Sequence, residues 1–395
     1  MPRARGHTLQ IQTQLPTNDF IPFNRPFVAG TEAALVAAAT QEGQLSGEGP
    51  YTQFSQAWLE KRTGTAKVLL TPSCTHALEM SALLADIKEG DEVILPSYTF
   101  VSTGNAFALR GAHLIFVDLD PATMNIAPQA IANAISPKTK AIVLMHYGGV
   151  ACDMDAIMAI AQAEGIPVIE DAAHCLDAYY QGKHLGSFGA LGTLSFHQTK
   201  NIHCGEGGAL MINQAEWIER AQIIREKGTN RKAFQEGRVQ AYTWVDIGSS
   251  QLLGELPAAF LQGQLLAADQ VLEQRLQRWH RYQDVFAELE QKERIERVQI
   301  PQGVSINGHL FYLKCRDQTE RSALTRFLQE RQIQAYFHYL PLHRSTAGQR
   351  FGTFRGNDQY TTKDSERLLR LPLYTALKPE EQTRVIEAVF DFYHE

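Results

Sequence analysis

A single lysine near the middle of the chain follows a strand-like run. The apolar run 192–196 leads into a polar segment that contains Lys200, and glycines follow at positions 205, 207 and 208. A lysine amine forms Schiff bases with carbonyl compounds. The nearby hydroxyl of Ser195 suits a phosphate group, and the glycines let a ligand approach the backbone closely. Most lysines are solvated surface charges, so a catalytic role needs support from other segments.

Two ionisable residues follow another strand of the buried type. The run 168–171 (VIED) ends in Asp171, and His174 lies three residues further on. Ligands of open α/β sheets bind at the carboxyl ends of the strands. An aspartate there can pair with the pyridinium nitrogen of pyridoxal phosphate (PLP), which keeps the ring protonated and electron-withdrawing. His174 could donate to the phenolic oxygen of that ring. The alternatives are a helix N-cap for Asp171 and a core histidine for His174.

Two further segments lie where a strand passes into a polar turn. Segment 70–78 (LTPSCTHAL) is rich in hydroxyls and leads into a helix, so its free backbone N–H groups and the helix dipole favour an anion site. Segment 96–103 (PSYTFVST) offers aromatic rings, and one of them could stack on a flat heterocycle. The alternatives are a plain helix cap for the first segment and core packing of Tyr98 or Phe100 for the second.

Composition and charge exclude several classes of protein. The chain has 395 residues with a net charge of −6 and no cluster of Lys and Arg of the kind that binds nucleic acid. No apolar segment follows the basic start, and no run approaches the ~18 apolar residues of a membrane span. The five cysteines form no C-x-x-C pair, so we expect neither a disulfide framework nor a metal site. We therefore expect a cytoplasmic protein without a nucleic-acid or membrane partner.

Short apolar strands alternate with amphipathic helices from about residue 55. Strands are predicted at 66–70, 92–95, 114–118, 141–145, 167–170 and 192–196, and helices at 56–62, 75–86, 128–135 and 154–164. This alternation is typical of an α/β fold in which helices cover both faces of a mostly parallel sheet.

The pattern changes after about residue 265. A long charged helix is predicted at 267–289, and strands at 310–313 and 335–338 together with helices at 321–331 and 380–393 follow it. We therefore expect an N-terminal extension (1–20), a large domain (21–265) and a smaller C-terminal α+β domain (266–395).

The four chemical segments, in this order and at these separations, resemble the sugar aminotransferases of the DegT/DnrJ/EryC1/StrS family. The resemblance extends from segment 21–26 to about residue 373. It implies the fold of aspartate aminotransferase (PLP fold type I), which has a large domain with a seven-stranded, mostly parallel sheet between helices. It also implies PLP as cofactor and a homodimer whose subunits share their active sites.

Carried over position by position, the resemblance implies a role for each candidate residue. Lys200 would be the Schiff-base lysine and proton shuttle, and Asp171 would hold the pyridinium nitrogen. The other implied cofactor contacts are His174 at the phenolic oxygen, Phe100 on the ring, Thr75, the backbone N–H of His76 and Ser195 at the phosphate, and Ser249 or Ser250 from the second subunit. Most of the family has Asn where Ser250 lies, so Ser249 is an alternative contact. The implied contacts with the sugar nucleotide are His338, Tyr339 and His343.

Several matching runs, among them 69–75, 96–103, 225–231 and 361–373, also suggest the reaction. They resemble family members that transfer the amino group of L-glutamate to C4 of TDP-4-keto-6-deoxyglucose. The products would be TDP-4-amino-4,6-dideoxygalactose and 2-oxoglutarate. Amination at C3, or at C4 with the gluco configuration, are alternatives within the same family.

Other chemistries fit the sequence less well. Related PLP-dependent sugar dehydratases carry His in place of the lysine, which Lys200 argues against. A nicotinamide-dependent dehydrogenase would need a strand–GxGxxG–helix unit, and neither the glycines of 186–192 nor those of 205–208 have that context. A non-catalytic binding protein would need a broken site, yet both Asp171 and Lys200 are present.

Overall fold

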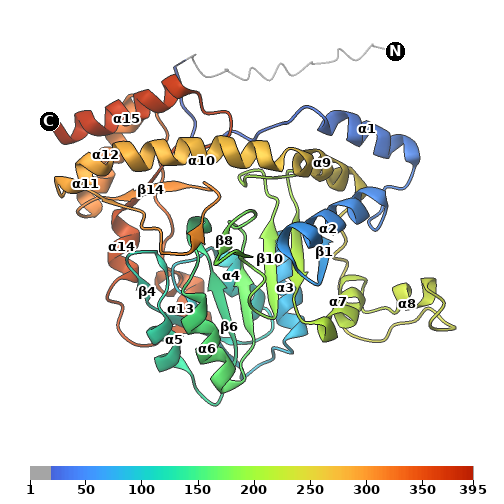
Figure 1. Ribbon diagram of the computed structural model, residues 1–395. Coiled ribbons are helices and arrows are strands. Elements are labelled where there is room, and N and C mark those ends of the chain that lie inside the picture. The colour runs from blue at the N-terminus through green and yellow to red at the C-terminus, as the bar shows by residue number, and fades with distance from the viewer. Residues whose placement is uncertain (1–18, 395) are drawn as a thin grey trace, which may run out of the picture.

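An eight-stranded sheet forms the centre of the molecule (Figure 1). The computed structural model describes residues 19–394, so the predicted extension 1–20 lies outside this range except for its last two residues. The strands, in spatial order, are β1 (Lys67–Thr71), β11 (Gly208–Ile212), β10 (Leu191–Ser195), β7 (Val168–Asp171), β6 (Thr139–Met145), β2 (Glu92–Pro96), β3 (His113–Val117) and β15 (Gly352–Phe354).

Most neighbouring strands of this sheet are parallel. Only β11 runs against its neighbours, and it pairs antiparallel with both β1 and β10. The predicted mostly parallel α/β sheet is therefore confirmed. The resemblance implied seven strands, and the sheet has an eighth, β15, at its edge. This strand comes from late in the chain and pairs parallel with β3.

Alternate residues of the strands pack against helices on opposite faces. Val93 and Leu95 pack on one face and Ile94 on the other, and all three are buried. The first face is covered by α3 (Cys74–Leu84), α4 (Val101–Ala108) and α7 (Ile218–Arg225). The second face is covered by α2 (Pro50–Thr63), α5 (Pro128–Ala134), α6 (Met154–Glu164) and α9 (Glu255–Leu266), and α1 (Glu32–Glu42) packs on α9. Such burial on both faces explains why these strands are almost continuously apolar.

The C-terminal part packs around a core that includes Tyr282, Phe286 and Phe311, and residues that follow strands of the large sheet, such as Tyr98 and Tyr147, belong to the same core. The long helix α10 (Ala268–Val285) runs from α9 toward α15 along one end of the molecule (Figure 1). The other elements here are α11 (Ala287–Gln291), α12 (Gln318–Glu330), α13 (Thr346–Phe351), α14 (Thr361–Arg367), α15 (Pro379–His394) and a sheet of β12 (Glu296–Arg297), β14 (Phe311–Lys314) and β16 (Leu368–Leu371). The division of the chain at residue 265 stays a prediction.

The strand predicted at 335–338 is wrong. Only one isolated bridge, between Tyr336 and Arg370, links this segment to β16. Tyr336 and Phe337 are exposed, whereas His338 faces a cavity, so the segment lacks the regular alternation of a half-buried strand. It instead forms part of the cavity wall.

Small elements complete the fold. They are β4 (Leu119–Asp120) paired with β5 (Asn125–Ile126), a sheet of β13 (Val304–Ser305), β8 (Tyr179–Tyr180) and β9 (Lys183–His184), the helix α8 (Arg231–Gln235), and 3-10 turns at Tyr147–Gly149, Ala215–Trp217 and Leu342–Arg344. Figure 1 shows α8 standing out from the body of the molecule.

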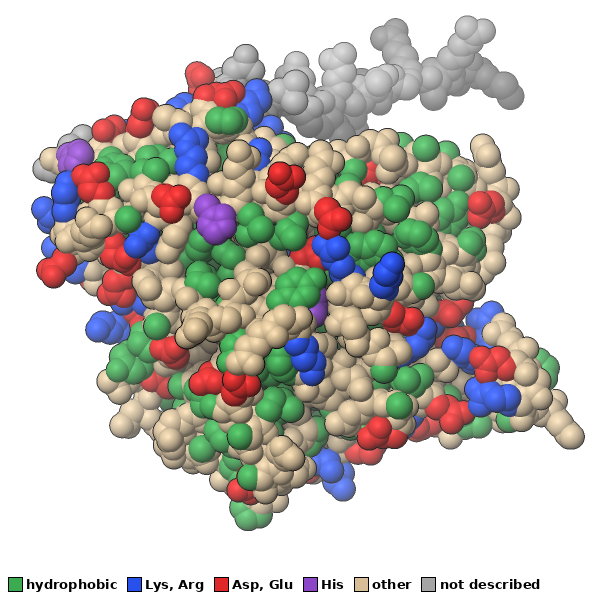
Figure 2. Space-filling model, in the orientation of Figure 1, with side chains coloured by type: hydrophobic (Ala, Val, Ile, Leu, Met, Phe, Trp, Pro, Cys, Tyr) green, Lys and Arg blue, Asp and Glu red, His purple; other side chains and the backbone are tan. Residues whose placement is uncertain are grey.

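The surface charge and the apolar character of the helices are relevant to nucleic-acid and membrane partners. On the face shown in Figure 2, acidic and basic side chains are interspersed, and no broad basic area lies there. Within residues 19–394, no helix combines the length and the apolar character needed to cross a bilayer. All five cysteines are free thiols. No cluster of three metal-binding side chains lies in the described part of the chain.

Candidate active site

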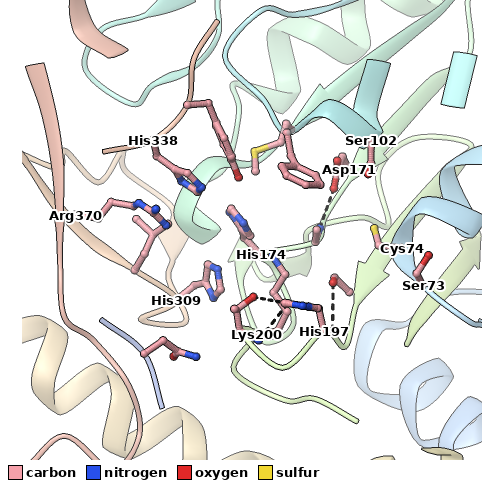
Figure 3. A pocket seen from close by; sticks show the side chains of 18 of the residues that line it. Ser73, Cys74, Ser102, Asp171, His174, His197, Lys200, His309, His338 and Arg370 are labelled. Atoms are coloured by element: carbon pink, nitrogen blue, oxygen red, sulfur yellow. Dashed lines mark hydrogen bonds between the residues drawn. The ribbon is translucent and has the colours of Figure 1, made fainter. Parts of the chain in front are cut away.

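A cavity of about 550 Å³ lies at the carboxyl ends of β7 and β10. Its lining combines residues of the large sheet with residues that follow position 300 (Figure 3). Most of the predicted site residues line it, namely Thr75, Phe100, Asp171, His174, Ser195, Lys200, His338 and Tyr339. Strand ends that are distant in sequence therefore meet at one site, as parallel topology requires.

Lys200 lies in the loop that joins the antiparallel strands β10 and β11. Its backbone N–H donates to the carbonyl of His197 at 2.9 Å, which tightens the turn. Burial lowers the pKa of the Lys200 ammonium, although the carboxylate of Asp171 opposes that shift. A lowered pKa increases the share of neutral amine, which is the nucleophilic and basic form.

Asp171, the last residue of β7, is buried and held by two donors. The Thr103 hydroxyl donates to one carboxylate oxygen at 2.7 Å, and the backbone N–H of Ala173 donates to the other at 3.1 Å. The Thr103 hydroxyl is itself 2.7 Å from the hydroxyl of Thr99. Burial raises the pKa of the Asp171 carboxyl even though both donors oppose the shift. A cation placed beside it would reverse that shift, so Asp171 suits a protonated ring nitrogen.

His174 lines the cavity in one defined tautomer. Its Nδ1 accepts the backbone N–H of Gly148 at 3.2 Å, so its proton lies on Nε2. Burial, reinforced by the charge of Lys200, sets the pKa of His174 well below its usual value, so the ring is neutral. A neutral imidazole with a proton on Nε2 can donate to an oxygen of a ligand.

A polar chain beside Lys200 has no counterpart among the sequence predictions. The side-chain oxygen of Asn201 accepts from Nδ1 of His309 at 2.9 Å. The His309 ring packs against that of His174, with 4.2 Å between centroids and a tilt of 32°. The Asn307 amide donates to the carbonyl of His174 at 2.7 Å. Residues 307–309 thus fix the surroundings of both Lys200 and His174. Residues 307–309 lie far along the chain from Lys200 and His174, so no local sequence pattern indicates this contact.

The N-terminus of α3 forms the opposite end of the cavity. The Ser73 hydroxyl caps the helix by accepting the backbone N–H of His76 at 3.3 Å and also lies 2.8 Å from His76 Nδ1. Thr75 shares a 2.8 Å hydrogen bond with Ser102. Free N–H groups, hydroxyls and the helix dipole together favour an anion here. His76 does not line the cavity, and its N–H is already engaged by the cap.

Gly208 determines how closely β11 approaches this helix end. A Cβ on Gly208 would lie 2.3 Å from the backbone nitrogen of Cys74, so only glycine fits there. Gly208 is also the register partner of Ser195 across the β10–β11 pair, which places the Ser195 hydroxyl beside the start of α3. The anion cradle therefore fits a phosphate, and Asp171 fits the cationic end of the same ligand.

Of the other predicted contacts, Phe100 and His338 line the cavity and His343 does not. Phe100 is exposed, and its ring lies 6.2 Å from that of Tyr339. His338 lies 3.2 Å from the Tyr147 hydroxyl. His343 is outside the cavity lining, because Ser97 Oγ at 2.7 Å and Asp358 at 3.1 Å hold its ring nitrogens.

Ser249 and Ser250 are exposed and do not line the cavity of their own chain. Their backbone is fixed: Ser249 donates to the carbonyl of Ile224 at 2.9 Å and accepts from Lys227 at 3.0 Å. Apolar side chains are exposed in the same segment, with Trp244 78% exposed. The predicted contact of these serines with a second subunit stays a prediction.

Arg370 also lines the cavity and was missed by the sequence predictions. It lies in β16, where a lone charge interrupts the apolar run 368–373 (LLRLPL). A charged residue inside a buried strand was the available signal, since such residues are rarely buried without a partner.

Comparison with known proteins agrees with this geometry. The model of the DegT/DnrJ/EryC1/StrS aminotransferase family matches residues 27–390. Solved structures that are similar include the aminotransferase TlmJ from Streptoalloteichus hindustanus, at 28% identity, a TM-score of 0.87 and coverage of 95% of this chain and 99% of that chain. A DegT DnrJ EryC1 StrS aminotransferase from Brucella abortus is similar at 27% identity, a TM-score of 0.84 and coverage of 92% and 95%.

A third similar structure is a candidate sugar aminotransferase from Streptococcus pneumoniae in its PLP form. It shows 25% identity and a TM-score of 0.87 over 95% of this chain and 99% of that chain. The family match spans nearly all of the described fold and both ends of the cavity. The chain therefore belongs to the DegT/DnrJ/EryC1/StrS family of PLP-dependent sugar aminotransferases.

Proposed function

We propose that this aminotransferase moves the amino group of L-glutamate to C4 of TDP-4-keto-6-deoxyglucose. The products are TDP-4-amino-4,6-dideoxygalactose and 2-oxoglutarate. The observation that carries aminotransfer is the meeting of Lys200, Asp171 and the N-terminus of α3 in one cavity. The choice of sugar is supported by runs 225–231 and 361–373, which resemble the enzyme of this reaction in the enterobacterial common antigen pathway.

The two ends of the cavity would hold the two ends of PLP. Asp171 pairs with the ring nitrogen, while Thr75, Ser195 and the start of α3 bind the phosphate. Phe100 packs on the ring, and the Nε2–H of His174 donates to its phenolic oxygen. Bound PLP supplies a carbonyl group that takes up amines and a ring that withdraws electrons.

Lys200 acts as the acid–base group of the reaction. Its neutral amine accepts the proton that leaves Cα of the amino donor, and its ammonium returns a proton in the same cavity. When the keto sugar is the acceptor, Lys200 moves a proton in the reverse direction, at C4. The lowered pKa of Lys200 supports this role, because a catalytic base must spend time unprotonated near neutral pH.

The working unit in this proposal is a cytoplasmic homodimer. The exposed side chains of Tyr242, Trp244 and Ile247 come shortly before Ser249 and Ser250 in the chain, and exposed apolar groups of this kind favour a protein contact. A second subunit docked there would bring one of these serines to the phosphate of the other. The sugar nucleotide would contact His338 and Tyr339, which line the cavity, whereas the placement of His343 favours a supporting role.

The reaction is tested by its product. We expect the purified protein, given PLP, L-glutamate and TDP-4-keto-6-deoxyglucose, to form one amino sugar with an axial C4 amine in the NMR spectrum. An equatorial amine would change the sugar and keep the mechanism. A C3 amine would require a different keto sugar. Absence of any amino sugar from a folded protein that contains PLP would contradict the proposed substrate.

The Thr103 hydroxyl is expected to support cofactor binding through Asp171. Thr103→Val keeps the shape of the side chain but removes the donor at 2.7 Å from the carboxylate. Hydrogen bonds to charged groups contribute about 1.5–3 kcal/mol, so the Kd for PLP should rise by roughly 10- to 100-fold. Fluorescence titration with PLP measures this, and Thr103→Ser should bind as the parent protein does. Equal affinity of the valine variant would refute the role.

A further inference from the structure

Arg370 is a cavity residue that the steps above leave unused. It lies in β16, near the end of the chain, and its side chain reaches into the cavity from the side opposite Ser73 and Cys74 (Figure 3). Among the described residues that line the cavity, only Arg370 and Lys200 are arginine or lysine. Lys200 is committed to the chemistry, so Arg370 is the remaining fixed positive charge.

The guanidinium of Arg370 is held in place without a counter-ion. One nitrogen, Nη2, donates to the carbonyl of Phe337 at 3.2 Å, and the Phe23 ring lies under the group at 4.6 Å. Nε is buried and has no hydrogen-bond partner among the described residues. No carboxylate within residues 19–394 forms an ion pair with it.

The other charged or titratable groups of the cavity do not compensate this charge. His174, His309 and His338 have pKa values well below the usual range, mainly because they are buried, so they are neutral. Asp171 is engaged by Thr103 and Ala173. Glu206 is mostly exposed and lies 3.6 Å from His197. A partly desolvated cation without a counter-ion is unfavourable, and an anionic ligand would complete the arrangement.

We propose that Arg370 binds the α-carboxylate of the amino donor. This inference rests on the proposed aminotransferase function. The planar fork of a guanidinium matches the two oxygens of a carboxylate. Such a clamp would orient the donor, so that its Cα–H bond faces Lys200.

The alternative anion is the diphosphate of the sugar nucleotide, and its position favours it less. Arg370 and Lys200 line the same cavity, and the charge of Arg370 also helps to lower the pKa of Lys200. An α-carboxylate is bonded directly to the carbon whose proton Lys200 removes. A diphosphate is separated from C4 by the width of the sugar ring. A cation near Lys200 therefore suits the carboxylate.

The test separates the two halves of the reaction. Arg370→Met keeps most of the apolar contact with Phe23 and removes the charge. Loss of a buried charged contact weakens binding strongly, so the concentration of L-glutamate that half-saturates the PLP enzyme should rise by roughly 100-fold. Conversion of the PMP enzyme by the keto sugar should change by less than about threefold, since Arg370 makes no contact with the sugar in this proposal.

A modified amino donor and a control variant make the test specific to the charge of Arg370. L-isoglutamine has an α-amide in place of the α-carboxylate and should be a poor donor for the parent protein, whereas Arg370→Met should no longer discriminate it from L-glutamate. Arg344→Met removes an arginine that lies outside the cavity and pairs with Glu366, so it should behave as the parent. Binding of glutarate, measured by calorimetry, should weaken in Arg370→Met without any reaction taking place.

The outcomes distinguish the inference from the function on which it rests. If the sugar half-reaction is impaired and the glutamate half-reaction is not, Arg370 binds the diphosphate and the inference is overturned. Equal loss in both halves would also overturn it, because that result indicates a general effect on the cavity. If the parent protein itself does not react with L-glutamate or any other amino donor, the proposed function fails instead.

Discussion

Lys200→Ala is expected to abolish aminotransfer while the protein still folds. No other lysine lines the cavity among the residues that the structure describes, so no nearby amine can take over. Loss of an acid–base group alone lowers rates by about 10²–10⁴-fold, and loss of the covalent attachment of PLP adds to this. Alanine removes a cation from a buried position, so the melting temperature should not fall.

The measurement is a steady-state assay beside a thermal melt followed by circular dichroism. Lys183→Ala provides the control, because Lys183 is exposed and stacks on the Phe188 ring at 4.6 Å, away from the cavity. The Lys200 variant should also lack the absorbance band of lysine-bound PLP. Turnover in a clean preparation of Lys200→Ala would refute the assignment.

Asp171→Asn is expected to reduce kcat/KM by about 10²–10³-fold, because breaking a buried charge pair costs about 3–5 kcal/mol. A neutral amide cannot hold the protonated ring nitrogen, so the ring withdraws electrons less strongly. The amide also brings a donor where the carboxylate now accepts from Thr103 and Ala173. We therefore expect a smaller loss of stability, of about 1–3 kcal/mol, from the donor left facing another donor.

Steady-state kinetics and urea unfolding of the same preparation separate these two effects. Asp171→Glu keeps the charge but displaces it by one methylene group, so it should retain more activity than the amide variant. Thr103→Val, which keeps the carboxylate charge, should be the mildest of the three. If Asp171→Asn has the kinetics of the parent protein, Asp171 does not hold the ring.

The sequence predicted the parts of the fold that depend on local periodicity. The helix predicted at 154–164 has the same bounds as α6, and the strands around Ile94, Ile142 and Ile169 were found because strands buried on both faces are apolar throughout. The cavity could be predicted because parallel strands end at one edge of the sheet. Asp171 ends one such strand and Lys200 follows another, so their meeting required no knowledge of side-chain contacts.

Features that depend on tertiary contacts were missed. Helix α4 contains β-branched residues and Gly104, which are poor helix formers. It is stabilised by packing, since a Cβ on Gly104 would already lie 3.1 Å from Leu114. Arg370 and His309 reach the cavity from a sheet and a loop that follow residue 300, and His343 is held away from it by Asp358. Local patterns do not contain such contacts.

One wall of the cavity consists of residues near the end of the chain, which are synthesised last. Lys200 and the strands on either side of it are synthesised by residue 212, but His338, Tyr339 and Arg370 close the same cavity from the far end of the chain. A shorter chain lacks this wall, so the surroundings of Lys200 are complete only when synthesis has passed residue 370. The selectivity of the cavity for its cofactor therefore depends on the last part of the chain to be made.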